Sequence, residues 1–187
     1  MISEFLASNS GGLHDENGDS PDWIELHNDS ASPINLAGWH LTDTPGNPVM
    51  WTFPATNLPA GRFLLVFASG KDRPQLGTNF LHTNFKLNPD GDYLGLFNAE
   101  SPPVAVTELS PQYPSQRNDY SYGLNPSNQW RYYASPTPRA TNGDSAISGA
   151  LTPVHFSIER GFFNAPFNLI LTSEAPGAAA RPGTTPV

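Results

Sequence analysis

The sequence has no cysteine, very few lysines and no apolar run long enough to cross a bilayer. Without cysteine the chain cannot form disulfides, thiolate zinc sites or a cysteine nucleophile. Only nine residues are basic, the arginines are scattered singly, and the net charge is −8. Because phosphate binding requires clustered basic side chains, we expect no nucleic-acid partner and no binding to anionic membrane surfaces. Because no apolar run is long enough, we also expect no insertion into a membrane.

The residues that are abundant favour short strands and turns. The chain has 20 prolines and 16 glycines, and 11% of its residues are aromatic while only 14% are charged. Frequent chain breakers argue against long helices. The many aromatic residues supply enough apolar surface for a core, so the chain is not a proline-rich disordered polymer.

Hydrophobic alternation predicts several strands. In residues 22–28, Ile24 and Leu26 share one face and Trp23, Glu25 and His27 the other. Residues 38–43, 49–53, 103–108, 119–123 and 129–133 are further strand candidates, and the first run is residues 2–7. Together they predict an all-β sandwich.

Two other runs specify more detail. Residues 62–68 are apolar on both faces, as in a central strand of a sandwich. Residues 80–87 and 92–97 bracket an Asn-Pro-Asp-Gly turn, residues 88–91. Because Asp-Gly between apolar runs is typical of tight turns, we expect a hairpin here.

Several motifs in this order resemble the lamin tail domain as it occurs in bacterial secreted proteins. They are Ile2-Ser3-Glu4-Phe5, Asp22-Trp23-Ile24-Glu25-Leu26, Leu36-Ala37-Gly38-Trp39-His40-Leu41-Thr42-Asp43, Leu81-His82-Thr83-Asn84-Phe85-Lys86-Leu87 and Ser121-Tyr122-Gly123. The resemblance implies an immunoglobulin-like β-sandwich over residues 1–142, with a binding or architectural role and no catalytic activity.

The remaining residues form a shorter second part. Residues 143–153 have the composition of a linker. Residues 154–171 read as two strands and are similar to the start of a chitobiase/β-hexosaminidase C-terminal-type repeat, but the end of that repeat is missing. We therefore expect residues 154–187 to be a partial β repeat followed by a mobile tail.

One polar loop contains the densest group of oxygen ligands. We predict it as a candidate calcium site, since calcium takes six to eight oxygens. The register of an EF-hand is absent and Pro21 interrupts the loop, so a solvated turn at a sheet edge is the alternative. The residues concerned are Asp15, Glu16, Asn17, Asp19 and Asp22. No other cofactor is expected.

No pattern points to catalysis. Glu4 and Glu25 could be read as an acid/base pair, but nothing brings them to a cleft, and Glu25 is expected on the solvent face of its strand. The five histidines show no HExxH or close paired spacing, and the sequence has no GxSxG. We predict no catalytic residues and no enzyme.

The aromatic residues raise one alternative. Trp39 and Trp51 are in phase with apolar neighbours and should fill the core. Trp23 is out of phase with Ile24, and Tyr132 is adjacent to Tyr133, so that one of the two must face outward. Trp23, Tyr132 and Tyr133 are therefore candidates for contacts with a glycan or another partner.

Taken together, the sequence predicts a non-catalytic binding or structural module. The first strand follows Met1 directly, without a signal peptide, so we expect a piece of a longer protein. The resemblance to bacterial lamin tail domains implies that this longer protein is exported and extracellular or at the cell surface. Its expected partner is a protein or a cell-surface component. The alternative is an accessory carbohydrate-binding module that contacts a polysaccharide.

Overall fold

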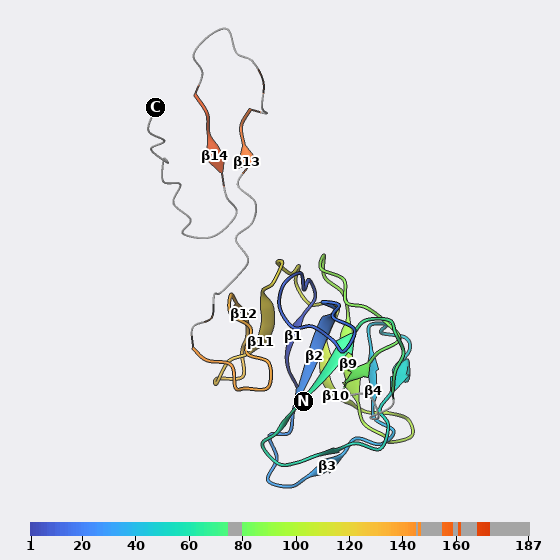
Figure 1. Ribbon diagram of the computed structural model, residues 1–187. Helices are drawn as coiled ribbons and strands as arrows, with labels where there is room; N and C mark the ends of the chain where they lie inside the picture. Colours follow the sequence, from blue (N-terminus) through green and yellow to red (C-terminus); the bar gives the residue numbers. More distant parts are fainter. Residues whose placement is uncertain (75–79, 145, 147–154, 159–160, 162–167, 173–187) are drawn as a thin grey trace. The chain divides into compact units, whose positions relative to one another are not determined.

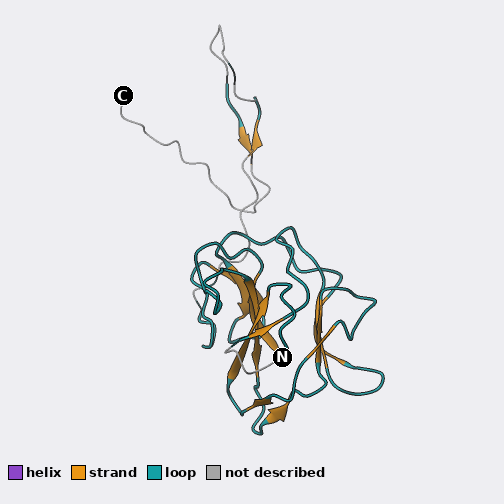
Figure 2. Cartoon of the chain, turned by 45° about the vertical axis from the view of Figure 1, so that its right-hand side comes forward, coloured by secondary structure: helices purple, strands orange, loops and turns teal. Residues whose placement is uncertain are grey.

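The computed structural model describes residues 1–74, 80–144, 146, 155–158, 161 and 168–172 (Figure 1). The chain divides into two compact units, Met1–Ser148 and Gly149–Val187. Figure 2 shows strands and loops but no helix in the residues described. Accordingly, these residues contain no helix of the length and hydropathy that a membrane crossing requires.

The first unit is built around a six-stranded sheet in the order β12-β11-β1-β2-β7-β8. All neighbouring pairs are antiparallel except β7 and β8, which are parallel. The predicted central position of the apolar run is confirmed, because β7 lies between β2 and β8. The six strands are β1 (Ile2–Leu6), β2 (Asp22–His27), β7 (Phe63–Ala68), β8 (Leu81–His82), β11 (Ser121–Leu124) and β12 (Trp130–Tyr133).

A second sheet of four strands, in the order β10-β9-β4-β5, completes the sandwich. Side chains from both sheets form one buried apolar cluster, which includes Ile24 and Leu26 from β2 and Leu41 and Leu96 from the smaller sheet. These strands are β4 (His40–Thr42), β5 (Trp51–Thr52), β9 (Leu94–Phe97) and β10 (Ala105–Leu109), and a separate short pair joins β3 (Ile34–Asn35) to β6 (Asn57–Leu58). The predicted all-β sandwich is confirmed.

The centre of the larger sheet, along β1 and most of β2, is buried on both faces. On the face opposite the main core, Trp23 and Phe67 join Leu6 and Leu65 in a second apolar cluster. Alternation along β2 therefore separates two buried environments rather than a core face from a solvent face. This arrangement determines where the candidate site residues lie.

The predicted hairpin between residues 80–87 and 92–97 does not form. The turn itself exists, with the amide of Gly91 bonded to the carbonyl of Asn88 and a φ of 105° at Gly91. However, β8 pairs with β7 in the larger sheet, while β9 pairs with β4 and β10 in the smaller one. The turn thus connects two sheets, because each strand finds a longer partner elsewhere.

In the second unit, the described residues include one short antiparallel pair, β13 (His155–Phe156) and β14 (Leu171–Thr172). The amide of Ser157 donates to the carbonyl of Ile170, and the Ser157 hydroxyl accepts from the Ile170 amide at 2.9 Å. Most of the predicted linker 143–153 and the predicted mobile tail at 175–187 lie outside the described residues.

Candidate functional site

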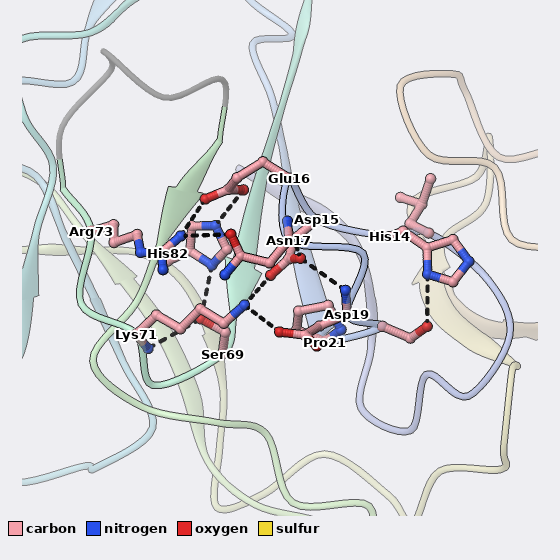
Figure 3. A network of polar contacts seen from close by, with 12 residues as sticks. His14, Asp15, Glu16, Asn17, Asp19, Pro21, Ser69, Lys71, Arg73 and His82 are labelled. Atoms are coloured by element: carbon pink, nitrogen blue, oxygen red, sulfur yellow. Dashed lines mark hydrogen bonds and ion pairs between the residues drawn. The ribbon is translucent and has the colours of Figure 1, made fainter.

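The acidic loop folds against the ends of β7 and β8 through charged contacts (Figure 3). The Asp15 carboxylate accepts the backbone amides of Asn17 and Asp19 at 2.9 and 3.1 Å, which fixes the turn. Its other oxygen contacts the Lys71 ammonium, which also lies 2.7 Å from Asp19 Oδ2. One lysine therefore forms ion pairs with two carboxylates of the loop.

A second part of this cluster centres on Glu16. Its Oε1 lies 2.5 Å from Arg73 Nη1, and its Oε2 lies 3.0 Å from His82 Nε2. Because a carboxylate only accepts hydrogen bonds, His82 Nε2 donates. The opposite ring nitrogen, Nδ1, lies 2.8 Å from the Ser69 hydroxyl, so both nitrogens of this fully buried ring have partners.

The charges of this cluster stabilise one another. Burial alone would raise the pKa of Asp15, but the Lys71 hydrogen bond and the two loop amides outweigh it and lower that pKa. The pKa of Glu16 is likewise lowered, against burial, chiefly by the hydrogen bond from His82. The two aspartates outweigh burial at Lys71 and raise its pKa. These ion pairs hold the loop on the sheet. The cluster, here called the staple, consists of Asp15, Glu16, Asp19, Lys71, Arg73 and His82.

The residues predicted as calcium ligands are only partly brought together. Asp15 and Asp19 share Lys71, and Asp15, Glu16 and His82 place ligand atoms within 4.8 Å of one another. Asp22, on β2, is not part of these groups, although it lines the same hollow as Asp19 and Lys71. Its carboxylate accepts the Asn9 amide at 3.2 Å. A calcium ion would compete with Lys71 and Arg73 for the same oxygens. Calcium binding stays a prediction.

Ser69, His82 and Glu16 have the residue types of a hydrolytic triad, but their surroundings differ from those of one. The Ser69 hydroxyl also accepts the Lys71 amide at 3.1 Å, and the Gly70 amide donates to the Phe85 carbonyl. The two amides that follow the serine are thus engaged and cannot stabilise an oxyanion. We interpret these three hydrogen-bonded side chains as a structural part of the cluster that holds the loop on the sheet.

Asp22 lines a hollow of about 310 Å³ next to this cluster, together with Ser69, Lys71 and Lys86. Burial raises the pKa of Asp22 to about 6, although the Asn9 amide and the Lys86 charge act in the opposite direction. The hollow is lined by charges of both signs. This mixture selects neither an anionic nor a cationic ligand.

Glu4 and Glu25 lie directly opposite each other on β1 and β2, and both are fully buried. The prediction that Glu25 is on the solvent face is therefore wrong. Glu4 accepts from the hydroxyls of Ser121 and Thr137, and Glu25 accepts from the Ser3 hydroxyl at 2.8 Å. Burial raises both pKa values, that of Glu25 to about 7. A buried pair without access to solvent cannot act on a substrate.

Residues 134–142, here called the closing segment, cover the two glutamates. The Thr137 amide donates to Glu4 at 3.1 Å and the Arg139 amide donates to Glu25. Farther along, the buried Asn142 side chain donates to the carbonyls of Ser3 and Leu124 at 3.2 and 3.0 Å. The segment supplies the neutral donors that the two carboxylates need, and it therefore belongs to the folded sandwich.

The three aromatic residues predicted to contact a glycan or partner are buried. Trp23 is 1% exposed, Tyr132 5% and Tyr133 3%. The expectation that Trp23 and one of the two tyrosines face outward is wrong, because the larger sheet is covered on both faces. The tyrosine hydroxyls are also engaged, Tyr132 with the carbonyl of Ser115 at 2.7 Å and Tyr133 with that of Gly143 at 3.2 Å.

Two of the exposed apolar side chains lie in β10 or directly before it. Val104 and Val106 are 50% and 41% exposed. β10 is the last strand of its sheet, and among the described residues it pairs only with β9. The alternation in residues 103–108 predicted a strand but gave no sign that it lies at an edge, because pairing partners depend on residues far away in the chain.

The Lamin Tail Domain family model matches residues 1–110, which is more than half of the chain. No curated protein and no solved structure matches the chain. The matched range ends after β10, so it covers neither the closing segment nor the second unit. The resemblance of residues 154–171 to a chitobiase-type repeat stays a prediction.

Proposed function

Since the chain belongs to the lamin tail domain family of immunoglobulin-like binding and structural domains, we propose that it is a non-catalytic module of a larger exported multidomain protein. In this proposal it contacts another protein or a cell-surface component. The burial of the Glu4–Glu25 pair supports a role without catalysis, since the two carboxylates that could serve as acid and base reach no solvent.

The observation that carries the proposal is the open edge of β10. An edge strand exposes unpaired backbone groups that an extended segment of another chain can pair with. Here Val104 and Val106 add exposed apolar side chains at this edge. Pro102, Pro103 and Pro111 limit the open edge to a few residues, so it can accept a short strand but not an extended aggregate.

A photo-crosslinking experiment tests this contact surface. A benzophenone amino acid replaces Val106, or Val49 as the matched control, because Val49 is also exposed, at 49%, but lies outside β10. Each protein is incubated with surface-protein extract of the source cells. We expect discrete crosslinked products from position 106 and not from position 49. Equal products from both positions, or none from either, would contradict the proposal.

Carbohydrate binding is the second candidate, and the half-buried Trp130 ring favours it. Trp130 stacks on Tyr122 with ring centroids 5.4 Å apart and an interplanar angle of 15°. Such a pair offers a flat surface on which a sugar ring can lie. Co-sedimentation with insoluble chitin and cellulose, compared between the wild-type protein and Trp130→Ala, distinguishes this candidate from protein contact. If the wild-type protein sediments with the polysaccharide and Trp130→Ala does not, carbohydrate binding is favoured.

A further inference from the structure

The closing segment is attached to the larger sheet by hydrogen bonds rather than by apolar packing. Asn142 is its only buried residue, and none of its residues belongs to either apolar cluster. One attachment is the Asn142 side chain, which donates to two backbone carbonyls. The other is the pair of amides, from Thr137 and Arg139, that donates to Glu4 and Glu25. A segment with so little apolar burial can open without unfolding the sandwich.

The backbone of the segment is strained at Arg139. Its φ is 67°, in the left-handed region that residues with a side chain rarely adopt. The Arg139 amide nevertheless donates to Glu25, so this contact holds the residue in an unfavourable conformation. The Arg139 side chain itself is exposed, with its guanidinium carbon 5.6 Å from the centre of the Phe80 ring. Opening of the segment therefore relieves strain, while the apolar clusters stay intact.

The carboxylates under the segment have no cationic partner. Glu4 and Glu25 are cross-strand neighbours without exposed surface, and within the described residues neither forms an ion pair. When both are ionised, both lack hydration and the two charges repel each other. Burial is accordingly the largest cause of the raised pKa of each group. Water that enters when the segment opens removes this cost, so the open state binds the proton less tightly.

Two arginines come from the elements next to the pair, and neither neutralises it. The charge of Arg139, in the closing segment, lowers the pKa of Glu25, but burial raises that pKa by more. Arg131, on β12, donates to the Trp130 carbonyl at 2.8 Å and to the Gln129 side chain at 2.7 Å. The ionised pair therefore keeps an uncompensated negative charge while the segment is closed.

The other titratable groups on this face are neutral at pH 7. Burial and, less strongly, the charges of Glu4 and Asp144 raise the pKa of the Tyr133 phenol. Burial lowers the pKa of His27, which lies two residues after Glu25 on β2. The residues paired with the two glutamates on the outer neighbouring strands are uncharged, namely Gly123 on β11 and Leu65 on β7. The charge of this region thus changes chiefly through the glutamate pair.

We propose that the closing segment is a pH-sensitive cover, which stays closed in acid and opens toward neutral and alkaline pH. A pair that carries a proton has at most one buried negative charge, whereas the fully ionised pair has two and is hydrated only when the segment is open. Opening exposes both carboxylates and releases the segment that precedes the second unit in the chain. The cover acts independently of any partner at β10.

Proton linkage gives the sign and the size of the effect. The pKa of Glu25 is about 7 in the closed state, against 4.5 for the group in water. The closed state is therefore most favoured below pH 4.5 and loses this advantage as the pH rises through about 7. Between about pH 5 and 8, this group alone should raise the ratio of open to closed molecules by on the order of 70-fold.

Hydrogen exchange in the full chain tests the cover. The amides of Thr137 and Arg139 are followed by NMR, and their protection factors are corrected for the intrinsic exchange rate at each pH. We expect both protection factors to fall by at least about 50-fold from pH 5 to 8. Because the opening is local, low urea concentrations should change them little, whereas the protection of the Ile24 and Val66 amides in the core should fall with urea.

A double variant separates the glutamate pair from a general effect of charge. Glu4→Gln/Glu25→Gln removes both titrating groups, so the protection of Thr137 and Arg139 should change by less than about threefold from pH 5 to 8. Glu100→Gln, at an exposed position outside the segment, should keep the wild-type pH dependence. If the double variant does not fold, the pH and urea dependence of the wild-type protein still decide.

Three results would overturn the inference. The first is a protection of Thr137 and Arg139 that does not depend on pH, and the second is an equal decline in the double variant and the wild-type protein. The third is a urea dependence of these two amides as steep as that of Ile24 and Val66, because the segment would then open only when the whole sandwich unfolds.

Discussion

Glu4 and Glu25 face each other across β1 and β2, fully buried, and within the described residues their hydrogen-bond donors are hydroxyls and backbone amides rather than cations. Two adjacent carboxylates in such a place cannot both be charged without a large cost. Burial, reinforced by the charge of Glu4, raises the pKa of Glu25 from its ordinary 4.5 to about 7. The pair therefore holds a proton near neutral pH.

This proton gives the first prediction. Because the folded state binds it more tightly than the unfolded chain, its contribution to stability is complete below pH 4.5 and is lost as the pH rises through about 7. We expect the free energy of unfolding to fall by on the order of 2 kcal/mol between about pH 5 and 9. Glu25→Gln should remove the part of this decline that is centred near pH 7, as measured by urea denaturation across the pH range.

The exposed Glu100 provides the control. Glu100→Gln changes the net charge by the same amount and should leave the pH profile as in the wild-type protein. Burial also raises the pKa of Asp22, to about 6, so a smaller decline at the acidic end remains in Glu25→Gln. A wild-type profile that is flat from pH 5 to 9, or a decline as large in Glu25→Gln as in the wild-type protein, would show that the pair carries no shared proton.

The closing segment gives a second prediction, which concerns the extent of the domain. Asn142 is 4% exposed and its amide bonds to two backbone carbonyls. Asn142→Ala leaves both carbonyls without these donors and should cost about 2–3 kcal/mol of unfolding free energy. Ser135→Ala, at an exposed position of the same segment, should cost less than about 0.5 kcal/mol. Equal stability of the two variants would mean that the sandwich does not need residues beyond β12.

Local patterns predicted the strands but not what covers them. The alternation along residues 22–28 correctly separated Ile24 and Leu26 from Trp23 and Glu25. It could not reveal that the second face is also buried, because Glu25 is covered by Arg139, which is 114 residues away in the sequence. A period-two pattern shows that the two faces of a strand differ in composition. It does not show that one of these faces is exposed to solvent.

The same limit applies to the candidate site. The acidic residues of the loop were recognisable because they are neighbours in sequence. Their partners Lys71, Arg73 and His82 lie more than 50 residues later and form no motif with them. Similarly, the Asp-Gly turn was recognisable at residues 90–91, but the partners of β8 and β9 are set by the whole sandwich.

The staple yields a third prediction, on calcium. In the wild-type protein Lys71 occupies the oxygens of Asp15 and Asp19 that a calcium ion would need. We expect calcium at about 5 mM to raise the melting temperature of Lys71→Met more than that of the wild-type protein, because binding to the folded state alone is stabilising. Arg62→Met, which removes an exposed basic side chain outside the staple and outside the hollow next to Asp22, is the control. An equal response of all three proteins would exclude competition between Lys71 and calcium.

Trp23 gives the fourth prediction. Its ring is 1% exposed and packs with Leu6, Leu65 and Phe67 on the second face of the larger sheet. Trp23→Ala should therefore lower the unfolding free energy by about 3–5 kcal/mol, because it leaves a cavity that these neighbours cannot fill. Trp130→Ala, at a half-buried position, should cost clearly less. Urea denaturation of both variants measures the difference.

Effects on stability and on binding must be separated for Trp23. Substitution of a core residue lowers the unfolding free energy, whereas substitution of an exposed contact residue lowers ligand affinity. If Trp23 fills the core, Trp23→Phe should recover most of the lost stability, and any ligand affinity should be unchanged when calculated per folded molecule. If Trp23→Phe instead lowers ligand affinity while its stability equals that of the wild-type protein, Trp23 contacts the ligand. The ring packs on Leu6 and Phe67, so only a rearrangement of the second cluster could expose it to a ligand.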